Sequence, residues 1–576
     1  MHYIYKLSRI AIIALLLTYT PLLFGQTITM KSIQAEGEIS LSLATHSDNS
    51  TVTIDWGDGN KKDYTLGKVE TECKGPATKQ TITITGDIAK LNCMASKLIE
   101  LDVTKCPNLW VLQAAYNNIG ALDLSASKAL GNLEVFGNMI KELDVSACTE
   151  LERLVCSGNY LSNLNVSSCK KLKYLDCTRM ARITSLDLTQ NQNLTNLLIN
   201  ECSISELKLP QGNVPLEEFW CHKNKISSLD LSSYTGLKEL NCSDNPLTSL
   251  TVNAPEMNQL MVMNTQLKDV AFLSSMPKLT YLMLTGNAGL TSVTLSKNSQ
   301  LTDLGLSKCS LSKLDLSAQK VLKNLWAEAN QLTAVDLSSC EKLESVKLKG
   351  NQISQITFPA KSSITTLALP ENALVDISLK GLNELQSLDL GKNQLTKIDL
   401  SSCPKLKVLN LGSNQIHTLD LQHTPQLKML GVVGNGMSAE QLDKIYEALP
   451  ELDEPSAKVN LYNGTKKDSE ALSSTTDIAV ERNWKPFVLG DGSWRGVLDI
   501  EPLQLRIAQQ KERVTLYPSA SGHPLRVSLY SSDGMLHQSE QIVDDPMIIY
   551  LPAPGSYVLL IEDCVTSETQ TQLLLN

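Results

Sequence analysis

Aromatic side chains are scarce in this chain of 576 residues, at 5% of the total, although 42% of the residues are apolar. A chain of this length is too long for a single globular core, and a leucine-heavy composition is typical of stacked repeats. Basic charge is also short, since the formal net charge is −10. The basic footprint of a nucleic-acid-binding protein is therefore missing, and we expect no nucleic-acid partner.

Catalytic motifs are absent as well. The sequence contains no H-E-x-x-H, no G-x-S-x-G and no G-x-x-x-x-G-K-[ST], and it has 7 histidines in all. Each of these motifs places reactive side chains or a phosphate-binding loop at a fixed spacing that the fold needs. We expect no enzyme activity and no cofactor.

Long apolar runs are limited to the N-terminus, where Lys6 and Arg9 precede the run Ile10–Leu17. This run is shorter than the ~20 residues that a membrane-spanning helix needs. It predicts a secretory signal peptide over residues 1–25, cut near Gly25, in place of a membrane anchor.

One pattern, L-x-x-L-x-L-x-x-N-x-L-x-x-L-D-L-S-x-C-x-x, recurs every 20 to 22 residues between about residue 88 and residue 437. Its clearest copy begins at Leu385, and the next begins at Leu406. The Asn position marks the register at Asn117, Asn138, Asn159, Asn224, Asn245, Asn287, Asn330, Asn351, Asn372, Asn393, Asn414 and Asn435, with replacements at Ser96, Met180, Cys202, Thr265 and Cys309. The pattern resembles the leucine-rich repeat. That resemblance implies a repeat solenoid, a leucine-rich repeat horseshoe with a parallel β-sheet on its concave face, flanked by small all-β domains.

The Asn position has a physical role in such a stack. A buried Asn can hydrogen-bond the backbone of the turn after each strand, which otherwise leaves polar groups unpaired in the interior. Ser, Thr and Cys can do this in part, but Met180 cannot. The step after Met180 is 22 residues long, so we predict a local distortion there.

The repeats hold 12 of the 14 cysteines. Ten of them form two columns, Cys93, Cys156, Cys177, Cys221 and Cys242 in the strand half, and Cys106, Cys148, Cys169, Cys340 and Cys403 in the other half. The second column resembles the cysteine ladder of internalin J-type repeats. Stacked side chains point in parallel and not at each other, so we predict reduced thiols packed as small apolar groups. No C-x-x-C pair or neighbouring His completes a zinc site, and we expect no metal here.

Alternation along each strand places some side chains on the concave face. The predicted partner-binding residues on this face are Phe136, Tyr174, Trp220, His222, Tyr281 and Trp326. Exposed aromatic rings flanked by polar groups suit a binding surface. The alternative is that some of the rings only pack on each other along the sheet.

An Asp recurs in the other half of the unit, at Asp102, Asp123, Asp144, Asp187, Asp230, Asp315, Asp336, Asp399 and Asp420. Stacked carboxylates ~5 Å apart repel one another unless cations or local hydrogen bonds relieve them. We favour hydrogen bonds to the residues that follow.

Residues 26–87 alternate polar and apolar side chains and predict a small β-rich domain or cap. Within it, Asp55-Trp-Gly-Asp-Gly59 resembles the W-x-x-G-D-G turn of polycystic-kidney-disease-type β-sandwiches. Asp55 and Asp58 are calcium candidates, but Asp-Gly is also a common hairpin turn, which we favour.

Beyond the repeats, Ser438-Ala-Glu-Gln441 is a capping box, and Leu442, Ile445, Tyr446 and Leu449 form one apolar stripe. They predict a helix within a C-terminal cap over residues 438–487, which a solenoid requires. A linker is expected over residues 488–512.

Residues 513–576 predict a small antiparallel β-sandwich. The order Y-P, L-Y-x-x-D-G and L-P-x-x-G-x-Y-V resembles the C-terminal sorting domain of the type IX secretion system of Bacteroidetes, although Ser519-Ala520 follows Tyr-Pro and Gln572 replaces the usual near-terminal Lys. The resemblance implies type IX secretion machinery as a partner during export, and a secreted or outer-membrane cell-surface location.

These features lead to two expectations of function. The first is a surface protein that binds a protein ligand on host cells, matrix or other bacteria, in adhesion or biofilm formation and virulence, as the internalin-like resemblance implies. The second is a glycan-binding surface module that uses the concave-face aromatics.

Overall fold

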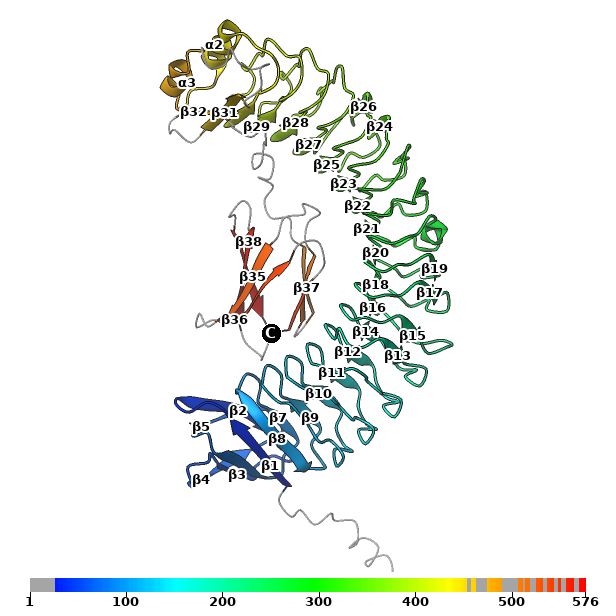
Figure 1. Cartoon of the computed structure of the whole chain (residues 1–576), viewed down its shortest axis with the longest axis vertical. Coiled ribbons are helices and arrows are strands. Elements are labelled where there is room, and N and C mark those ends of the chain that lie inside the picture. The colour runs from blue at the N-terminus through cyan, green and yellow to red at the C-terminus, as the bar shows by residue number, and fades with distance from the viewer. Residues whose placement is uncertain are drawn as a thin grey trace, which may run out of the picture. The chain divides into compact units, whose positions relative to one another are not determined.

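The computed structural model describes residues 26–452, 457–462 and 474–488, and seven strands, β33 to β39, between residues 506 and 575. The signal-peptide prediction for residues 1–25 lies outside the described residues. The chain divides into two compact units, Met1–Met257 and Asn258–Asn576. Figure 1 labels the helices and strands and colours them by residue number. Among the described residues, no helix has the length and apolar character needed to cross a bilayer.

The first unit begins with a small antiparallel domain, as the alternation of residues 26–87 predicts. Its strands are β1 Gln26–Ser32, β2 Glu38–Ala44, β3 Ser50–Asp55, β4 Lys61–Leu66, β5 Thr71–Pro76, β6 Thr81–Gly86 and β8 Leu98–Lys105. Five of them form a sheet in the order β4-β3-β6-β1-β8. Alternate side chains such as Ile28, Ile54 and Ile84 are fully buried. Strand β2 pairs with β5 and with β7 Lys90–Asn92, the first strand of the repeats.

The repeats of the first unit form one parallel ladder that begins at β7. Each strand pairs in register with the next, so that Leu91, Leu112 and Leu133 lie side by side and are fully buried. The following strands are β9 Val111–Gln113, β10 Asn132–Glu134, β11 Arg153–Val155, β12 Tyr174–Asp176, β14 Asn196–Leu198, β16 Glu218–Trp220 and β18 Glu239–Asn241.

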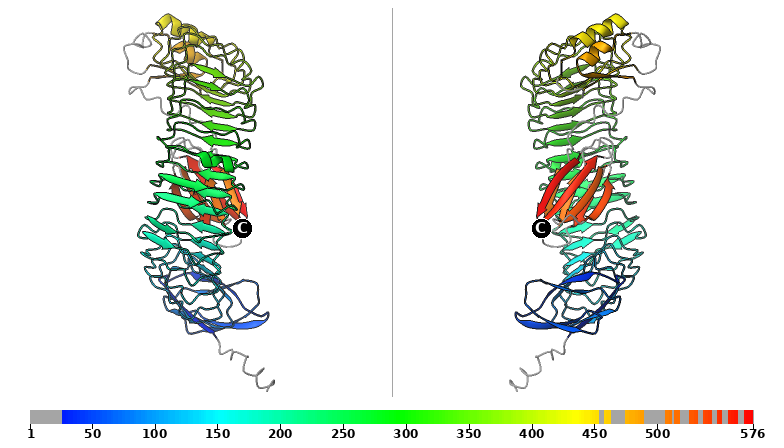
Figure 2. Two further views of the ribbon diagram at one scale, coloured as in Figure 1. Left: turned by 90° about the vertical axis from the view of Figure 1, so that its right-hand side faces the viewer. Right: turned by 90° about the vertical axis from the view of Figure 1, so that its left-hand side faces the viewer.

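The second unit contains a parallel ladder of the same kind. Its parallel strands are β20 Gln259–Met261, β21 Tyr281–Met283, β22 Asp303–Gly305, β23 Asn324–Trp326, β25 Ser345–Lys347, β27 Thr366–Ala368, β28 Ser387–Asp389, β29 Val408–Asn410 and β30 Met429–Gly431. A 3-10 helix, η1 Ala271–Ser275, occupies one loop. Figure 2 shows these short strands stacked one beside another. The predicted repeat solenoid is therefore confirmed.

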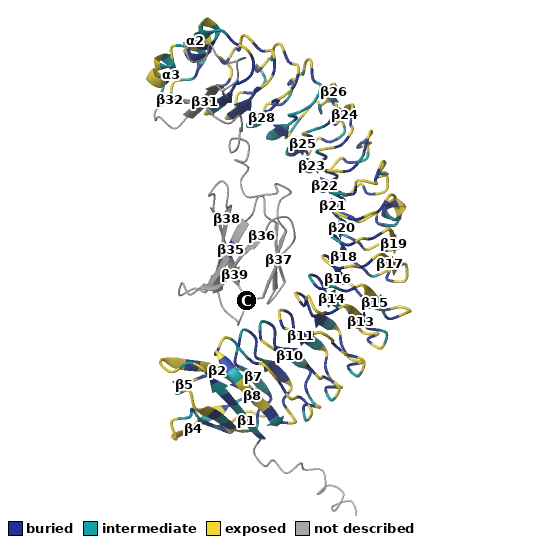
Figure 3. Ribbon diagram, viewed as in Figure 1, coloured by how far each residue is buried: buried dark blue, intermediate teal, exposed yellow. Residues whose placement is uncertain are grey.

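Short parallel ribbons form on the far side of the repeats. The pairs are β13 Ser185–Asp187 with β15 Glu206–Lys208, β17 Ser228–Leu231 with β19 Ser249–Val252, and β24 Ala334–Asp336 with β26 Gln355–Thr357. The buried side chains lie between these ribbons and the parallel ladder, whereas the outer loops are mostly exposed (Figure 3). The core is thus a continuous layer of leucines inside each unit.

The register marks are placed as predicted, because each lies four residues after the last residue of a parallel strand. In every one of the twelve asparagines, Nδ2 donates to a carbonyl of the preceding repeat at 2.6–3.0 Å. Their Oδ1 atoms accept a backbone N–H, as Asn138 does from Ile119 at 3.0 Å. Among the replacements, Cys202 and Cys309 donate through Sγ to a carbonyl of the preceding repeat at 3.3 Å. The predicted role of the Asn position is confirmed.

The distortion predicted at Met180 is also present, as one extra residue. In a regular repeat, the carbonyl of Ile119, two residues after its register mark, accepts the N–H of Met139 from the next repeat. Here the corresponding carbonyl is that of Ile183, which accepts the N–H of Ser203 and lies three residues after its register mark. The Ile183 N–H turns back to the carbonyl of Met180 at 3.0 Å. The Ile183 N–H is therefore satisfied within its own repeat. The equivalent N–H of Ile119 needs Asn138 of the next repeat as its acceptor.

The aspartate column makes local hydrogen bonds, as favoured from the sequence. Each Oδ1 accepts the backbone N–H two residues further on at 2.8–3.0 Å. The hydroxyl and amide of Thr104 lower the pKa of Asp102 in this way. These carboxylates thus stabilise turns.

The cysteine columns lie in the core. All 12 repeat cysteines are buried thiols that form no disulfide. This agrees with the prediction that they pack as small apolar groups. Burial raises the pKa of Cys93 to about 12 and that of Cys169 to about 11. Such thiols are unreactive, because the thiolate is the nucleophile.

The end of the repeats is closed by helix α2 Ala439–Ala448. Its predicted capping box is confirmed: Ser438 Oγ accepts the N–H of Gln441, and Gln441 Oε1 accepts the N–H of Ser438. The predicted stripe residues Leu442, Ile445 and Tyr446 are buried. Two further strands, β31 Ala457–Tyr462 and β32 Trp484–Val488, continue the parallel sheet, with α3 Asp477–Glu481 before β32.

The C-terminal strands form two antiparallel sheets, β33-β34-β37 and β36-β35-β38-β39. Their bounds are β33 Arg506–Gln510, β34 Arg513–Tyr517, β35 Leu525–Ser531, β36 Leu536–Ile542, β37 Met547–Tyr550, β38 Ser556–Asp563 and β39 Thr569–Leu575. Strand β33 falls inside the expected linker 488–512, so the linker prediction is wrong for these residues. It pairs with β34 across two residues, a hairpin that the sequence analysis overlooked.

Candidate binding face

We call the side of the parallel sheet that faces away from the leucine core the ladder face; it is the face predicted to be concave. In each repeat it carries the first and third strand residues and the residue two places further on. Because side chains alternate across a strand, these positions point away from the buried leucines.

On strand β10 the ladder face carries Glu134, whose side chain is 7% exposed. Its carboxylate accepts three hydrogen bonds from three consecutive strands: from Arg153 Nε at 2.9 Å, from Gln113 Nε2 at 3.2 Å and from Asn132 Nδ2 at 3.3 Å. A nearly buried carboxylate needs such partners to offset its lost hydration. Glu134 therefore fixes the position of Arg153.

Arg153 also stacks on an aromatic ring. Its guanidinium carbon lies 3.9 Å from the centroid of the Tyr174 ring, a short cation–π distance. In the two preceding repeats, Tyr116, which adjoins the ladder-face position Ala115, and Phe136 meet edge to face, with ring centroids 4.8 Å apart. We call the four side chains Tyr116, Phe136, Arg153 and Tyr174 the aromatic–arginine patch.

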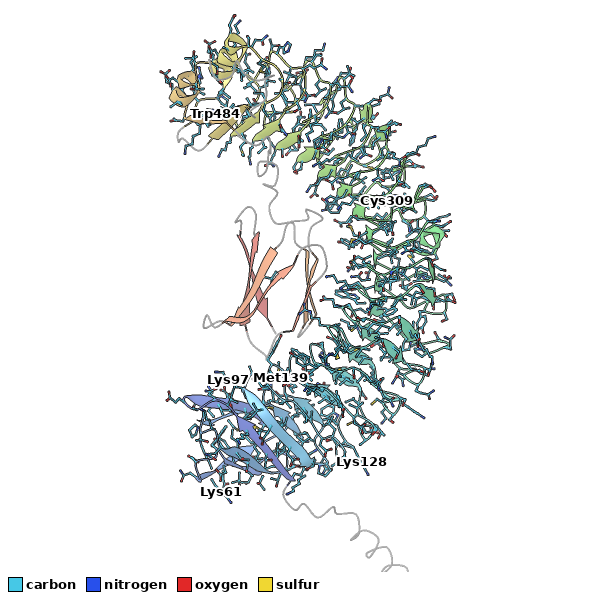
Figure 4. All side chains as sticks on the ribbon, in the orientation of Figure 1. Lys61, Lys97, Lys128, Met139, Cys309 and Trp484 are labelled. Carbon is cyan, nitrogen blue, oxygen red and sulfur yellow. The ribbon has the colours of Figure 1, made fainter. Side chains whose placement is uncertain are left out.

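Two exposed apolar side chains follow the ladder asparagines of the same repeats. Met139 is 46% exposed and Tyr160 is 51% exposed; Met139 is labelled in Figure 4. Their backbone N–H groups bond Ile119 and Ile140 in equivalent positions of consecutive repeats. The aromatic–arginine patch therefore belongs to repeats that also expose apolar surface.

The exposure expected for most of the predicted binding residues is wrong. Phe136 is 5% exposed, Trp220 0%, His222 0%, Tyr281 8% and Trp326 5%. Side chains that project from strands ~4.8 Å apart shield one another. Within one repeat, the rings of Trp220 and His222 also lie 6.0 Å apart. The alternative reading, in which rings pack along the sheet, describes these residues better.

Tyr174 differs from them, since it is only partly buried. Tyr174 lies beside Arg153 in the first unit. Its strand β12 is two strands along the ladder from β10, the strand that precedes Phe136. Trp220 and His222 share strand β16 and the residues after it, and Tyr281 and Trp326 lie in the second unit. Within the first unit, Phe136, Tyr174 and Trp220 thus belong to the repeats of β10, β12 and β16 and are spaced along the ladder.

In the second unit, methionine and aromatic side chains occupy the ladder face at β20, β21 and β23. Met283 is 3% exposed and lies over Gly305 in the next strand, where an added Cβ would stand 2.3 Å from its Sδ. Gly305 therefore makes room for the flexible thioether, which fills irregular gaps well.

Further along the second unit the ladder face becomes polar and small. Asp389 Oδ1 accepts the N–H of Gly391 at 2.8 Å and Nδ2 of Asn410 at 2.9 Å. Burial raises the pKa of Asp389 to about 6. This carboxyl therefore titrates closer to neutrality than an exposed Asp does.

The calcium candidates form a hairpin turn, as favoured. Asp55 Oδ1 accepts the N–H of Gly57 at 2.9 Å, and Asp58 Oδ1 accepts that of Asn60 at 3.0 Å. Strands β3 and β4 pair directly on either side. Within the part of the chain that the structure describes, no group of three or more His, Cys, Asp or Glu side chains could hold a metal ion.

Sequence reasoning missed Glu134 and Arg153, because it selected ladder-face residues for their rings alone. The signal was present in the register, since both occupy ladder-face positions in neighbouring repeats. Opposite charges at such positions lie within reach of each other in a parallel sheet.

Part of the repeat region matches a known family model. The family model for leucine-rich repeats in two copies matches residues 383–423. No curated protein matches the chain. The chain is similar to the solved functional domain of InlJ from Listeria monocytogenes, which includes a cysteine ladder, at 21% identity over 87% of this chain and 93% of that one, with a TM-score of 0.48.

Two other solved structures show comparable similarity. A leucine-rich repeat protein of Leptospira interrogans has 21% identity over 62% of this chain and 91% of its own, with a TM-score of 0.48. YopM from Yersinia enterocolitica has 24% identity over 57% of this chain and 70% of its own, with a TM-score of 0.45. The strand register and the asparagine ladder described above define the class: the chain is a leucine-rich repeat solenoid preceded by a small antiparallel β-domain.

Proposed function

We propose that this chain is an exported surface protein that binds a protein partner through its ladder face, in adhesion to host cells, matrix or other bacteria. The observation that carries the proposal is Arg153, which is held between the Glu134 carboxylate and the Tyr174 ring. Arginine and tyrosine fixed in advance lose little entropy on binding, which is why such residues dominate protein interfaces.

The surroundings of Arg153 support a protein partner. Its side chain is 26% exposed, and the same repeats expose Met139 and Tyr160. A partly exposed charged anchor, in repeats that also expose apolar side chains, suits the mixed core and rim of a protein interface. A glycan on the ladder-face aromatics is less favoured, because the buried rings of Trp220 and Trp326 offer no open face for stacking.

The experiment measures adhesion of the purified chain to host cells, matrix proteins and other bacteria. Arg153→Ala and Tyr174→Ala are expected to weaken binding by more than about 1 kcal/mol, roughly fivefold or more. Lys171→Ala is the matched control, since its ion pair with Glu150 is exposed and lies off the ladder face. Equal binding by all three variants would refute this role of the aromatic–arginine patch.

For location, we propose export by the signal peptide of residues 1–25 and by the C-terminal region, with the type IX machinery as partner. The apolar N-terminal run and the sorting-domain motifs support this route. A chain that ends at residue 487 keeps α2, β31 and all of β32 except Val488, and these elements close the repeat stack. It is expected to fold but to stay inside its native host, and surface display of this truncated chain would contradict the proposal.

A further inference from the structure

Trp110 is a large apolar side chain left in water. It is 54% exposed, whereas Trp56, Trp220, Trp326 and Trp484 are 5% exposed or less. It lies immediately before β9 in the first unit and is not one of the ladder-face positions. An indole at this exposure is unusual, because tryptophan is highly buried on average.

The backbone of Trp110 is held firmly. Its N–H donates to the carbonyl of Ala89 at 2.8 Å, and its own carbonyl accepts the N–H groups of Gly131 at 2.9 Å and Asn132 at 3.1 Å. These bonds tie the residue to the repeats on both sides, so the exposed ring is carried by a rigid element.

The ring itself rests on a glycine. A Cβ added at Gly131 would stand 2.4 Å from Nε1 and 2.9 Å from Cδ1 of Trp110. On the side of the preceding repeat, Lys90 Nζ lies 5.7 Å from the ring centroid. Gly131 and Lys90 thus orient the indole, and more than half of it still faces solvent.

A charge pair stands beside the ring. Lys90 Nζ lies 3.6 Å from Glu70 Oε1, and the two side chains are 30% and 31% exposed. The site therefore presents an aromatic surface, an ammonium donor and a carboxylate acceptor, while the two charges cancel. An apolar peptide side chain placed here would remove water from both charges without replacing their hydrogen bonds, which is costly.

We propose that Trp110, Lys90 and Glu70 form a binding site for a neutral sugar ring. The C–H face of a pyranose stacks on the indole. Its neighbouring hydroxyls accept a hydrogen bond from Lys90 and donate one to Glu70. This site lies off the ladder face and does not depend on the protein-binding function proposed above.

The experiment exposes the full chain to an array of neutral oligosaccharides and then titrates the best ligand by calorimetry. Trp110→Ala is expected to weaken binding at least tenfold, and Glu70→Gln several-fold, whereas Trp110→Tyr keeps most of the affinity because it keeps a ring. Gly131→Ala, which displaces the indole without removing it, is expected to weaken binding as well. Tyr160→Ala is the matched control, since that ring is 51% exposed but follows β11, two ladder strands beyond the β9 that Trp110 precedes.

The result that overturns the proposal is either no binding to any neutral sugar at millimolar concentration, or binding that Trp110→Ala leaves unchanged. Binding lost on Tyr174→Ala and kept by Trp110→Ala would place the sugar on the ladder face and also refute this site. If Trp110→Ala lowers the thermal midpoint, Glu70→Gln decides the question, because its side chain is partly exposed and contributes little to packing. Loss of adhesion in Arg153→Ala bears on the ladder face alone.

Discussion

Replacing one ladder asparagine, Asn138→Ala, tests how the repeats are held together. Asn138 makes four hydrogen bonds, with Nδ2 donating to the carbonyls of Ala114, Val135 and Phe136 and Oδ1 accepting from Ile119. Four lost bonds do not mean four unpaired groups, because three of the partners have a second bond.

The carbonyl of Ala114 also accepts from Asn117, that of Val135 from Asn159, and that of Phe136 from the N–H of Tyr116. Only the N–H of Ile119, a residue that is 0% exposed, loses its side-chain acceptor. A buried unsatisfied N–H costs about 1–3 kcal/mol, and the cavity left by the carboxamide costs roughly 1 kcal/mol more. The expected loss is about 2–4 kcal/mol.

The assay is urea unfolding followed by circular dichroism, with hydrogen exchange at the Ile119 amide as the local readout. The matched control is Asp144→Ala, whose lost bond to the Ser146 N–H lies at the surface, where water replaces it. We expect a lower midpoint and a faster-exchanging Ile119 amide only in Asn138→Ala. A midpoint equal to that of the control, or an Ile119 amide that stays protected, would refute the reasoning.

Four further outcomes are expected. Denatured chain should titrate the 12 repeat cysteines as free thiols, and six or more disulfides would sink the ladder interpretation. Because burial raises the pKa of Cys93 from 9.0 to about 12, its contribution to stability is complete below about pH 9 and is lost as the pH rises toward 12; a thermal midpoint that does not fall over this range would contradict it. Ser438→Ala removes the cap of α2 and should cost about 1 kcal/mol in chemical unfolding, whereas an unchanged midpoint would mean that the cap is not needed. Trp220→Ala should lower the free energy of unfolding about as much as Leu240→Ala, by roughly 3–5 kcal/mol, since both side chains are 0% exposed. An unchanged free energy of unfolding in Trp220→Ala would mean that burial of this ring does not contribute to stability.

The sequence predicted the repeats well because their signals are local and periodic. The recurring Asn at the register marks and the Asp two residues before its hydrogen-bond donor are short-range patterns, and the structure confirms both. The capping box at Ser438 is of the same kind.

The candidate site was harder to predict, because it depends on distances between repeats. Alternation correctly put Trp220 on the face opposite Phe219, but it carried no information on how far neighbouring side chains cover the ring. The Glu134–Arg153 pair and the contact of Trp110 with Gly131 join residues 19 and 21 positions apart. Such contacts become visible only once the exact side-chain positions of successive repeats are known.

The asparagine ladder also gives the chain an order of assembly. The Oδ1 of Asn138 completes the turn at Ile119, which belongs to the repeat before it, and Asn159 does the same for Ile140. A chain that emerges N-terminus first therefore leaves its newest turn open until the next 21 residues arrive. Nascent folding proceeds one repeat behind emergence, and in a chain stopped between Ile140 and Asn159 the amide of Ile140 should exchange with solvent while that of Ile119 stays protected.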